Sequence, residues 1–295
     1  MSRFVRGAGL VIIAVALAGC GSSHPAGPAG AAGSTAPAKG SATPQTAATL
    51  PPDGQQAGGQ AGAAGACQQP GTYLTAVRTG QHAGYDRVAF QFSGGLPAVT
   101  AERVTAVYAD PKGTKIPLPG QSSLRVVFRG ASGVCPQSAQ RTWTGPAVLT
   151  PYYPQLLTVS AAGDFEGYLS FGIGLAARGS YHVSTLTGPD RVVIDFSHVA
   201  LGKFPGIWDI TSWSQYWTTQ YAWLNGHQPW RSSPPMVVQA WANSHGYAHA
   251  AIHQVTAGTF TVTQPGQKTA TVTGTRPVSV PGPWVITRIA YGTTA

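Results

Sequence analysis

The feature that most limits what this chain can fold into is a stretch with almost no large side chains, residues 21–66. Thirty of its 46 residues are Gly, Ala or Pro, no residue is aromatic, and Leu50 is the only large aliphatic one. So little apolar surface cannot offset the conformational entropy that folding costs. We therefore predict a disordered tether over residues 20–66 and expect folded structure from residue 67 onward, where all eight Trp lie.

The first nineteen residues have the pattern of an export signal. Two arginines precede an apolar run over residues 7–17, which is shorter than the roughly 20 residues of a membrane-spanning helix. Small residues end the run before Cys20, and this resembles the lipobox of bacterial lipoproteins. We predict a signal peptide over residues 1–19 and a Cys20 that carries acyl chains such as palmitate, anchoring the protein to the outer face of the cell membrane. The alternative is an ordinary signal peptide with an incidental cysteine.

The chain has three cysteines, an odd number for an exported protein. Acylation of Cys20 leaves Cys67 and Cys135, and an oxidising compartment favours a disulfide between them. Two free buried thiols are the alternative. A metal site is not expected, because neither cysteine belongs to a C-x-x-C pair.

Charged residues are few and their balance is basic, with 18 Lys and Arg against nine Asp and Glu. Removal of the two arginines in the signal changes the net charge from +9 to +7, which favours anionic lipids or wall polymers as partners. Nucleic acid is not expected as a partner, because the basic residues are scattered and the compartment is wrong.

Residues 67–199 show repeated short strand patterns. In residues 86–93 the apolar positions Val88, Phe90 and Phe92 alternate with small or polar ones, and residues 190–197 repeat this shape. Further expected strands, separated by Gly and Pro, cover residues 103–108, 123–129, 155–161, 168–175 and 181–186. Many short strands at this spacing predict a mainly β fold, a sandwich or a barrel-like sheet.

Four blocks of this region resemble the AMIN-like domain of actinobacterial envelope lipoproteins. The blocks are residues 80–88 (GQHAGYDRV, with Phe90 and Phe92 following), 163–169 (GDFEGYL), 174–175 (GL) and 190–195 (DRVVID). The resemblance implies an all-β, non-catalytic module that binds a component of the cell envelope, such as peptidoglycan.

Five residues of these blocks are candidate ligand-binding residues: Tyr85, Asp86, Arg87, Asp164 and Glu166. Asp164 and Glu166 lie two positions apart and would share one face of a strand, as a general acid and base pair would. They could equally bind a ligand, cap turns, or pair with Arg87 or Arg191. We expect mainly structural roles for the carboxylates and predict no catalytic residue.

The pattern changes in residues 200–295, which predict a small α+β domain similar to the NTF2 cone. A first helix is expected after Asp209 as its N-cap, with apolar residues at helical spacing and Gly226 as the stop. A second helix is expected from Ser233 to about Asn243. Strands are expected over residues 252–257, 259–263, 269–273 and 284–291.

Two features of these last residues could carry a sharper function. Trp213, Trp217 and Trp284 could line an aromatic pocket, although helical spacing favours core packing for the first two. His245, His249 and His253 are spaced by four, as zinc ligands on one helix would be. Gly246 and the following strand pattern argue against such a helix, so no metal and no cofactor is predicted.

These observations predict a lipid-anchored, non-enzymatic protein of the cell envelope. It would bind peptidoglycan, another wall polymer or an envelope protein. One alternative is a small-ligand carrier or sensor that uses the aromatic pocket. The other is a wall hydrolase that uses Asp164 and Glu166.

Overall fold

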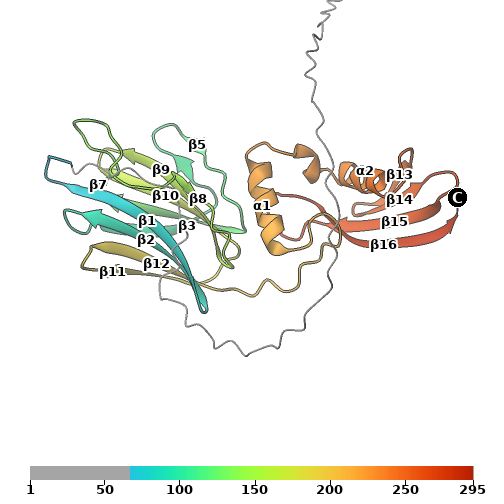
Figure 1. The fold of residues 1–295 in the computed structure, drawn as a ribbon, viewed down its shortest axis with the longest axis horizontal. Helices are drawn as coiled ribbons and strands as arrows, with labels where there is room; N and C mark the ends of the chain where they lie inside the picture. The colour runs from blue at the N-terminus through green and yellow to red at the C-terminus, as the bar shows by residue number, and fades with distance from the viewer. Residues whose placement is uncertain (1–66, 295) are drawn as a thin grey trace, which may run out of the picture. The chain divides into compact units, whose positions relative to one another are not determined.

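A computed structural model describes residues 67–294 of the chain (Figure 1). The predicted signal peptide of residues 1–19, the acylated Cys20 and the tether of residues 20–66 lie outside the described residues. None of the helices in residues 67–294 is both long and apolar enough to cross a membrane.

The first part of the described chain consists of two five-stranded sheets. The first sheet has the order β11-β12-β2-β1-β7, with β1 (Thr72–His82), β2 (Tyr85–Ser93), β7 (Ala131–Ser132), β11 (Tyr181–Leu186) and β12 (Arg191–Ser197). The second has the order β3-β6-β10-β9-β8, with β3 (Ala98–Val104), β6 (Ser122–Arg129), β8 (Val148–Leu149), β9 (Leu156–Phe165) and β10 (Tyr168–Leu175). A small ribbon joins β4 (Tyr108–Ala109) to β5 (Thr114–Lys115). Among the pairs of the two large sheets, the short contact between β1 and β7 is parallel and the others are antiparallel.

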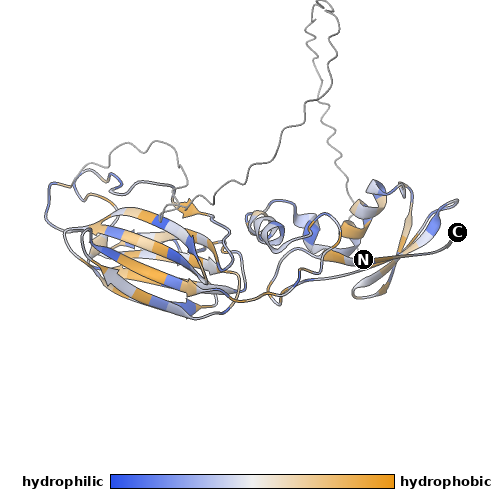
Figure 2. Cartoon of the chain, turned by 60° about the horizontal axis from the view of Figure 1, so that its bottom comes forward, coloured by the Kyte–Doolittle hydropathy of each residue, from blue (hydrophilic) through white to orange (hydrophobic). Residues whose placement is uncertain are grey.

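The core lies between these two sheets. Phe90 of β2 is fully buried, and its ring centroid lies 4.9 Å from that of Phe128 in β6 and 4.9 Å from that of Phe171 in β10. Figure 2 shows the alternation of hydrophobic and hydrophilic positions along the strands that this packing requires. The mainly β, sandwich-like fold predicted from the sequence is confirmed.

Five of the predicted strands agree with the structure to within one residue at each end, namely β2, β6, β10, β11 and β12. The strand predicted over residues 103–108 is wrong, because β3 covers Ala98–Val104. β3 is an edge strand without a fully buried residue, so its apolar pattern is weak. Strand β1 was not predicted, and a register shift between Leu74 and Ala76 interrupts its alternation.

The predicted disulfide between Cys67 and Cys135 is present, with the two Cα atoms 5.5 Å apart. It joins the first described residue to the loop that follows β7. Cys135 itself is buried.

The second part of the described chain is an α+β unit, as predicted. It comprises α1 (Trp213–Leu224), the short 3-10 helix η1 (Pro229–Ser232) and α2 (Pro234–Ser244). These precede the antiparallel strands β13 (Ala251–Thr256), β14 (Thr259–Thr263), β15 (Lys268–Thr275) and β16 (Val285–Thr294), which pair in sequence order. Helix α2 lies against this sheet (Figure 1), and its buried Val238 and Trp241 pack with Phe260 and Val272. The resemblance to an NTF2 cone remains a prediction.

Helix α1 begins later than the sequence suggested. Its N-cap is Ser212, whose Oγ accepts a hydrogen bond of 3.2 Å from the backbone N–H of Gln215. Asp209 is therefore not the cap. It lies in a left-handed conformation with φ of 64°, and its carboxylate pairs with Arg231 instead.

Candidate functional site

The conspicuous polar surface of the sandwich is the outer face of β2 and its neighbours. Successive side chains of a strand point to opposite faces, so Val88, Phe90 and Phe92 face the core while Tyr85 and Arg87 face outward. Of the candidate residues on β2, two therefore share the outer face.

Arg87 is held on this face by a bidentate ion pair. Its Nε donates to Oδ1 of Asp195 at 2.6 Å and its Nη2 to Oδ2 at 2.8 Å. The two residues lie opposite each other in the β2 and β12 pairing. The hydrogen bond and charge of Asp195 raise the pKa of Arg87, so the guanidinium stays charged and fixed in orientation.

An aromatic pair continues the same surface. The rings of His82 and Tyr85 stack with centroids 4.6 Å apart and an angle of 9° between their planes. The Arg87 guanidinium lies 5.4 Å from the centre of the Tyr85 ring. His82, Tyr85, Arg87 and Asp195 thus form a continuous set of side chains, which we call the outer strip. Its planar groups are suited to stacking on sugar rings or peptide groups.

More positive charge lies beside the outer strip. Arg78 is the cross-strand partner of the outward-facing Ala89, and its Nη1 donates to Oε1 of Gln91 at 2.8 Å. Arg191 of β12 is in turn the cross-strand partner of Gln91 in β2. With one carboxylate, Asp195, against three arginines, this face of the sheet favours an anionic ligand.

Asp86 lies on the opposite side of β2 and is fully buried. Its Oδ2 accepts hydrogen bonds from the backbone N–H groups of Gln155 at 2.7 Å and Leu156 at 2.9 Å. Its Oδ1 lies 2.8 Å from Nε2 of His198. The carboxylate thus joins β2 of the first sheet to the start of β9 in the second, and a ligand on the outer face cannot reach it.

Asp164 and Glu166 do not share a strand face. Asp164 is in β9, and its Oδ2 accepts hydrogen bonds from Ser132 Oγ at 2.8 Å and from the Gly133 N–H at 2.6 Å. Glu166 lies outside the strand, exposed in the turn to β10, with φ of 49°. The expected alternation ends at the turn, so the structure does not bring these carboxylates together as an acid and base pair.

The aromatic residues proposed for a pocket are divided between two cores. The rings of Trp213 and Trp217 stack at 5.4 Å in a cluster with Tyr216 and Phe204. Trp284 packs in the other cluster, beneath α2. The three tryptophans therefore line no common pocket.

The histidine series is also dispersed. His245 caps the end of α2, His249 lies in the following turn, and His253 is in β13. Over residues 67–294 no group of three or more His, Cys, Asp or Glu side chains is placed to hold a metal ion.

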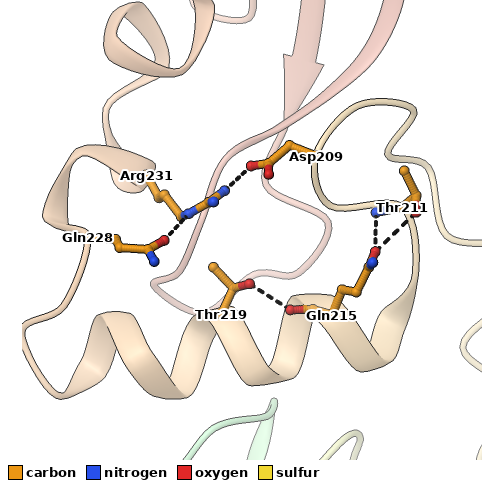
Figure 3. Close-up of polar contacts among 6 residues, drawn as sticks. All are labelled: Asp209, Thr211, Gln215, Thr219, Gln228 and Arg231. Carbon is orange, nitrogen blue, oxygen red and sulfur yellow. Dashed lines mark hydrogen bonds and ion pairs between the residues drawn. The ribbon is translucent and has the colours of Figure 1, made fainter. Parts of the chain in front are cut away.

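A small polar cleft of about 230 Å³ lies beside α1 (Figure 3). Arg231 lines one side, and its guanidinium contacts both Asp209 and Gln228. Thr219 and Gln215 lie across from it on α1, where the Thr219 hydroxyl donates to the Gln215 carbonyl at 2.7 Å. Both partners of Arg231 have positive φ, 64° for Asp209 and 50° for Gln228. Because Arg231 pairs with Asp209, the cation of this cleft already has a counter-charge.

Comparison with known proteins places the sandwich in a family. Residues 72–198 match the family model of the AMIN-like domain, which confirms that this part of the sequence is AMIN-like. No curated protein and no solved structure matched the chain.

Sequence reasoning did not select His82 or Asp195 as members of the surface. Both lie in the blocks that resemble the AMIN-like domain, so the composition of those blocks was the available signal. Their contacts with Tyr85 and Arg87 depend on strand register, which a single sequence does not reveal.

Proposed function

We propose that this protein, whose residues 72–198 form an AMIN-like domain, is a non-enzymatic binding protein of the cell envelope. The outer strip would be its contact surface for peptidoglycan or a related anionic wall polymer. The observation that carries this proposal is the fixed array of His82, Tyr85 and Arg87 on an outward sheet face.

The chemistry of the strip matches such a polymer. Stacked rings offer flat apolar contact to the faces of sugars at a low cost in side-chain entropy. Arg78 and Arg191 add positive charge that attracts the carboxylates of wall peptides or phosphates of wall polymers. Because Asp195 already orients Arg87, little ordering is needed when a ligand binds.

Binding without turnover is supported by the placement of the two carboxylates considered for hydrolysis. Asp164 accepts hydrogen bonds from Ser132 and Gly133 of a neighbouring loop, and Glu166 lies in a turn. The lipobox-like sequence before Cys20 supports a location at the outer face of the membrane, with residues 20–66 as a spacer toward the wall.

The test is co-sedimentation of the full-length protein, in detergent, with purified peptidoglycan. Tyr85→Ser and the double variant Arg78→Gln with Arg191→Gln should each weaken sedimentation by about tenfold, since a stacked ring or an ionic contact contributes on the order of 1 to 2 kcal/mol. Tyr108→Ser is the matched control, because Tyr108 is an exposed tyrosine on β4.

Equal binding by the Tyr85 and Tyr108 variants would disprove the assigned surface. Failure of the unaltered protein to sediment would disprove the ligand class. Steady release of soluble fragments by the unaltered protein, abolished by Asp164→Asn with Glu166→Gln, would support the hydrolase instead.

A further inference from the structure

A cleft in the α+β unit has no role in the function proposed above. It is a solvent-open cleft of about 440 Å³, lined by Trp223 at the end of α1, Ser232 of η1, Arg276, and the loop of residues 279–282. It lies in the unit of residues 201–294, which the AMIN-like match does not include. Any ligand of this cleft would therefore be additional to the ligand of the outer strip.

The cleft contains a cation without a counter-charge. Residues 201–295 hold five Lys and Arg side chains but a single carboxylate, Asp209. That carboxylate pairs with Arg231. Among the residues that the structure describes, Arg276 forms no ion pair.

Arg276 is nevertheless held in place. Its Nη2 donates a hydrogen bond of 2.8 Å to the backbone carbonyl of Ser232, across the cleft lining. A guanidinium has five N–H donors, so this contact fixes its direction and leaves most donors for a ligand. Planar donor pairs of this kind suit the two oxygens of a carboxylate or phosphate.

The opposite wall is preorganised and partly apolar. Val280 and Pro281 face the cleft with Trp223, and the buried Gln220 holds the loop by donating from Nε2 to the Pro281 carbonyl at 3.0 Å. A Cβ atom at Gly282 would lie 2.7 Å from Oη of Tyr216, so a larger residue does not fit there. The loop therefore lies against the hydroxyl end of the buried Tyr216 side chain.

The Tyr216 hydroxyl behind this wall is an independent sign of a specialised site. It is buried and has no hydrogen-bond partner. Burial raises the pKa of Tyr216, and the nearby positive charge of Arg276 opposes part of that rise. A buried hydroxyl without a partner costs stability, and such costs concentrate at functional sites.

We propose that this cleft binds an oxyanion, a carboxylate or a phosphate, carried on a compact ring such as a sugar. The Arg276 guanidinium would hold the anion, and Trp223 would contact the ring. The hydroxyls of Ser232 and Ser279 supply further hydrogen bonds to polar groups of the ligand. The smaller cleft at Arg231 has no cation without a counter-charge, because Asp209 already neutralises Arg231.

Three probes test the proposal by isothermal titration calorimetry on the full-length protein in detergent. They are N-acetylmuramic acid, which carries a carboxylate, glucose 1-phosphate, which carries a phosphate, and the neutral N-acetylglucosamine. At least one acidic probe should bind at a single site, and the neutral sugar should bind at least tenfold more weakly. Whichever acid binds more tightly identifies the source of the anion.

Arg276→Gln should weaken binding of the acidic probe by about tenfold or more, and high salt should weaken binding to the unaltered protein. Arg288→Gln is the matched control, because Arg288 is an exposed arginine on β16 outside the cleft. Ser279→Trp fills the cleft but keeps Arg276, and it should also abolish binding of the acidic probe. If Arg276→Gln does not fold, this second variant tests the proposed site.

The proposal is overturned if neither acid binds, or if the neutral sugar binds as tightly as the acids. It is also overturned if Arg276→Gln or Ser279→Trp binds like the unaltered protein, or if Arg288→Gln loses as much affinity as Arg276→Gln. The outer-strip variants should leave this binding unchanged, so the two sites are tested separately.

Discussion

At the scale of single residues, three neighbours in sequence have different roles. Tyr85 and Arg87 belong to the outer strip, whereas Asp86 between them is buried and accepts two backbone hydrogen bonds from the other sheet. A strand places consecutive side chains on opposite faces, so this separation is unavoidable once β2 has formed. The Tyr-Asp-Arg sequence thus combines a surface contact with a structural one.

The role of Asp86 predicts a large loss of stability on substitution. Asp86→Ala removes the acceptor of the Gln155 and Leu156 N–H groups and leaves both buried and unpaired. We expect the free energy of unfolding to fall by about 3 kcal/mol. The variant loses hydrogen bonds to a charged acceptor, and it also leaves two buried donors unsatisfied.

Chemical denaturation of the variant measures this loss. Glu166→Gln serves as the control, since Glu166 is an exposed carboxylate in a turn, and should change stability by no more than about 0.5 kcal/mol. An equally small effect of Asp86→Ala would show that this buried carboxylate does not hold the two sheets together.

At the scale of elements, the hairpin of β9 and β10 explains why particular residues stand in the block of residues 163–169. Phe165 pairs with Tyr168, so Glu166 and Gly167 form a two-residue turn, with φ of 49° and 76°. Two residues with positive φ match the turn type that suits the twist of a hairpin. Gly163 is required for a different reason, because a Cβ atom there would lie 2.7 Å from Cβ of Asp110.

The turn geometry predicts a stabilising substitution. Asparagine tolerates the left-handed conformation better than glutamate does. Glu166→Asn should therefore raise the free energy of unfolding by about 0.5 to 1 kcal/mol. Gly167→Ala should lower it by about 1 kcal/mol or more, because it adds a Cβ atom at positive φ.

Thermal denaturation of these two variants and the unaltered protein provides the measurement. The opposite order of stabilities would mean that the turn does not have this conformation in solution.

At the scale of the whole molecule, the disulfide secures the beginning of the described chain. Cys67 and Cys135 are 68 positions apart, and their link ties the residues before β1 to the loop after β7. In the chain-entropy account, a cross-link over a loop of this length restricts the unfolded chain more than the folded one.

Loss of the disulfide should cost up to about 4 kcal/mol of unfolding free energy. Cys67→Ser, Cys135→Ser and the double variant should lose the same amount, because each removes the same link. Denaturation curves under non-reducing conditions check this, and additive losses in the double variant would contradict a disulfide in the purified protein.

The mainly β character of the fold and the α+β pattern that follows it were determined by the sequence alone. Local alternation and helical spacing follow from which residues face a core, and a short stretch of chain carries that information. The cysteine count and the predicted export of the protein were likewise enough to predict the disulfide.

Only the tertiary structure decided which side chains meet. Arg87 and Asp195 are 108 positions apart, and His198 lies 112 positions from its partner Asp86. The cleft at Arg276 likewise combines the end of α1 with a loop more than 50 residues later. Alternation tells which face of a strand is buried, but strand order and register set its neighbours, and these depend on the packing of the whole chain.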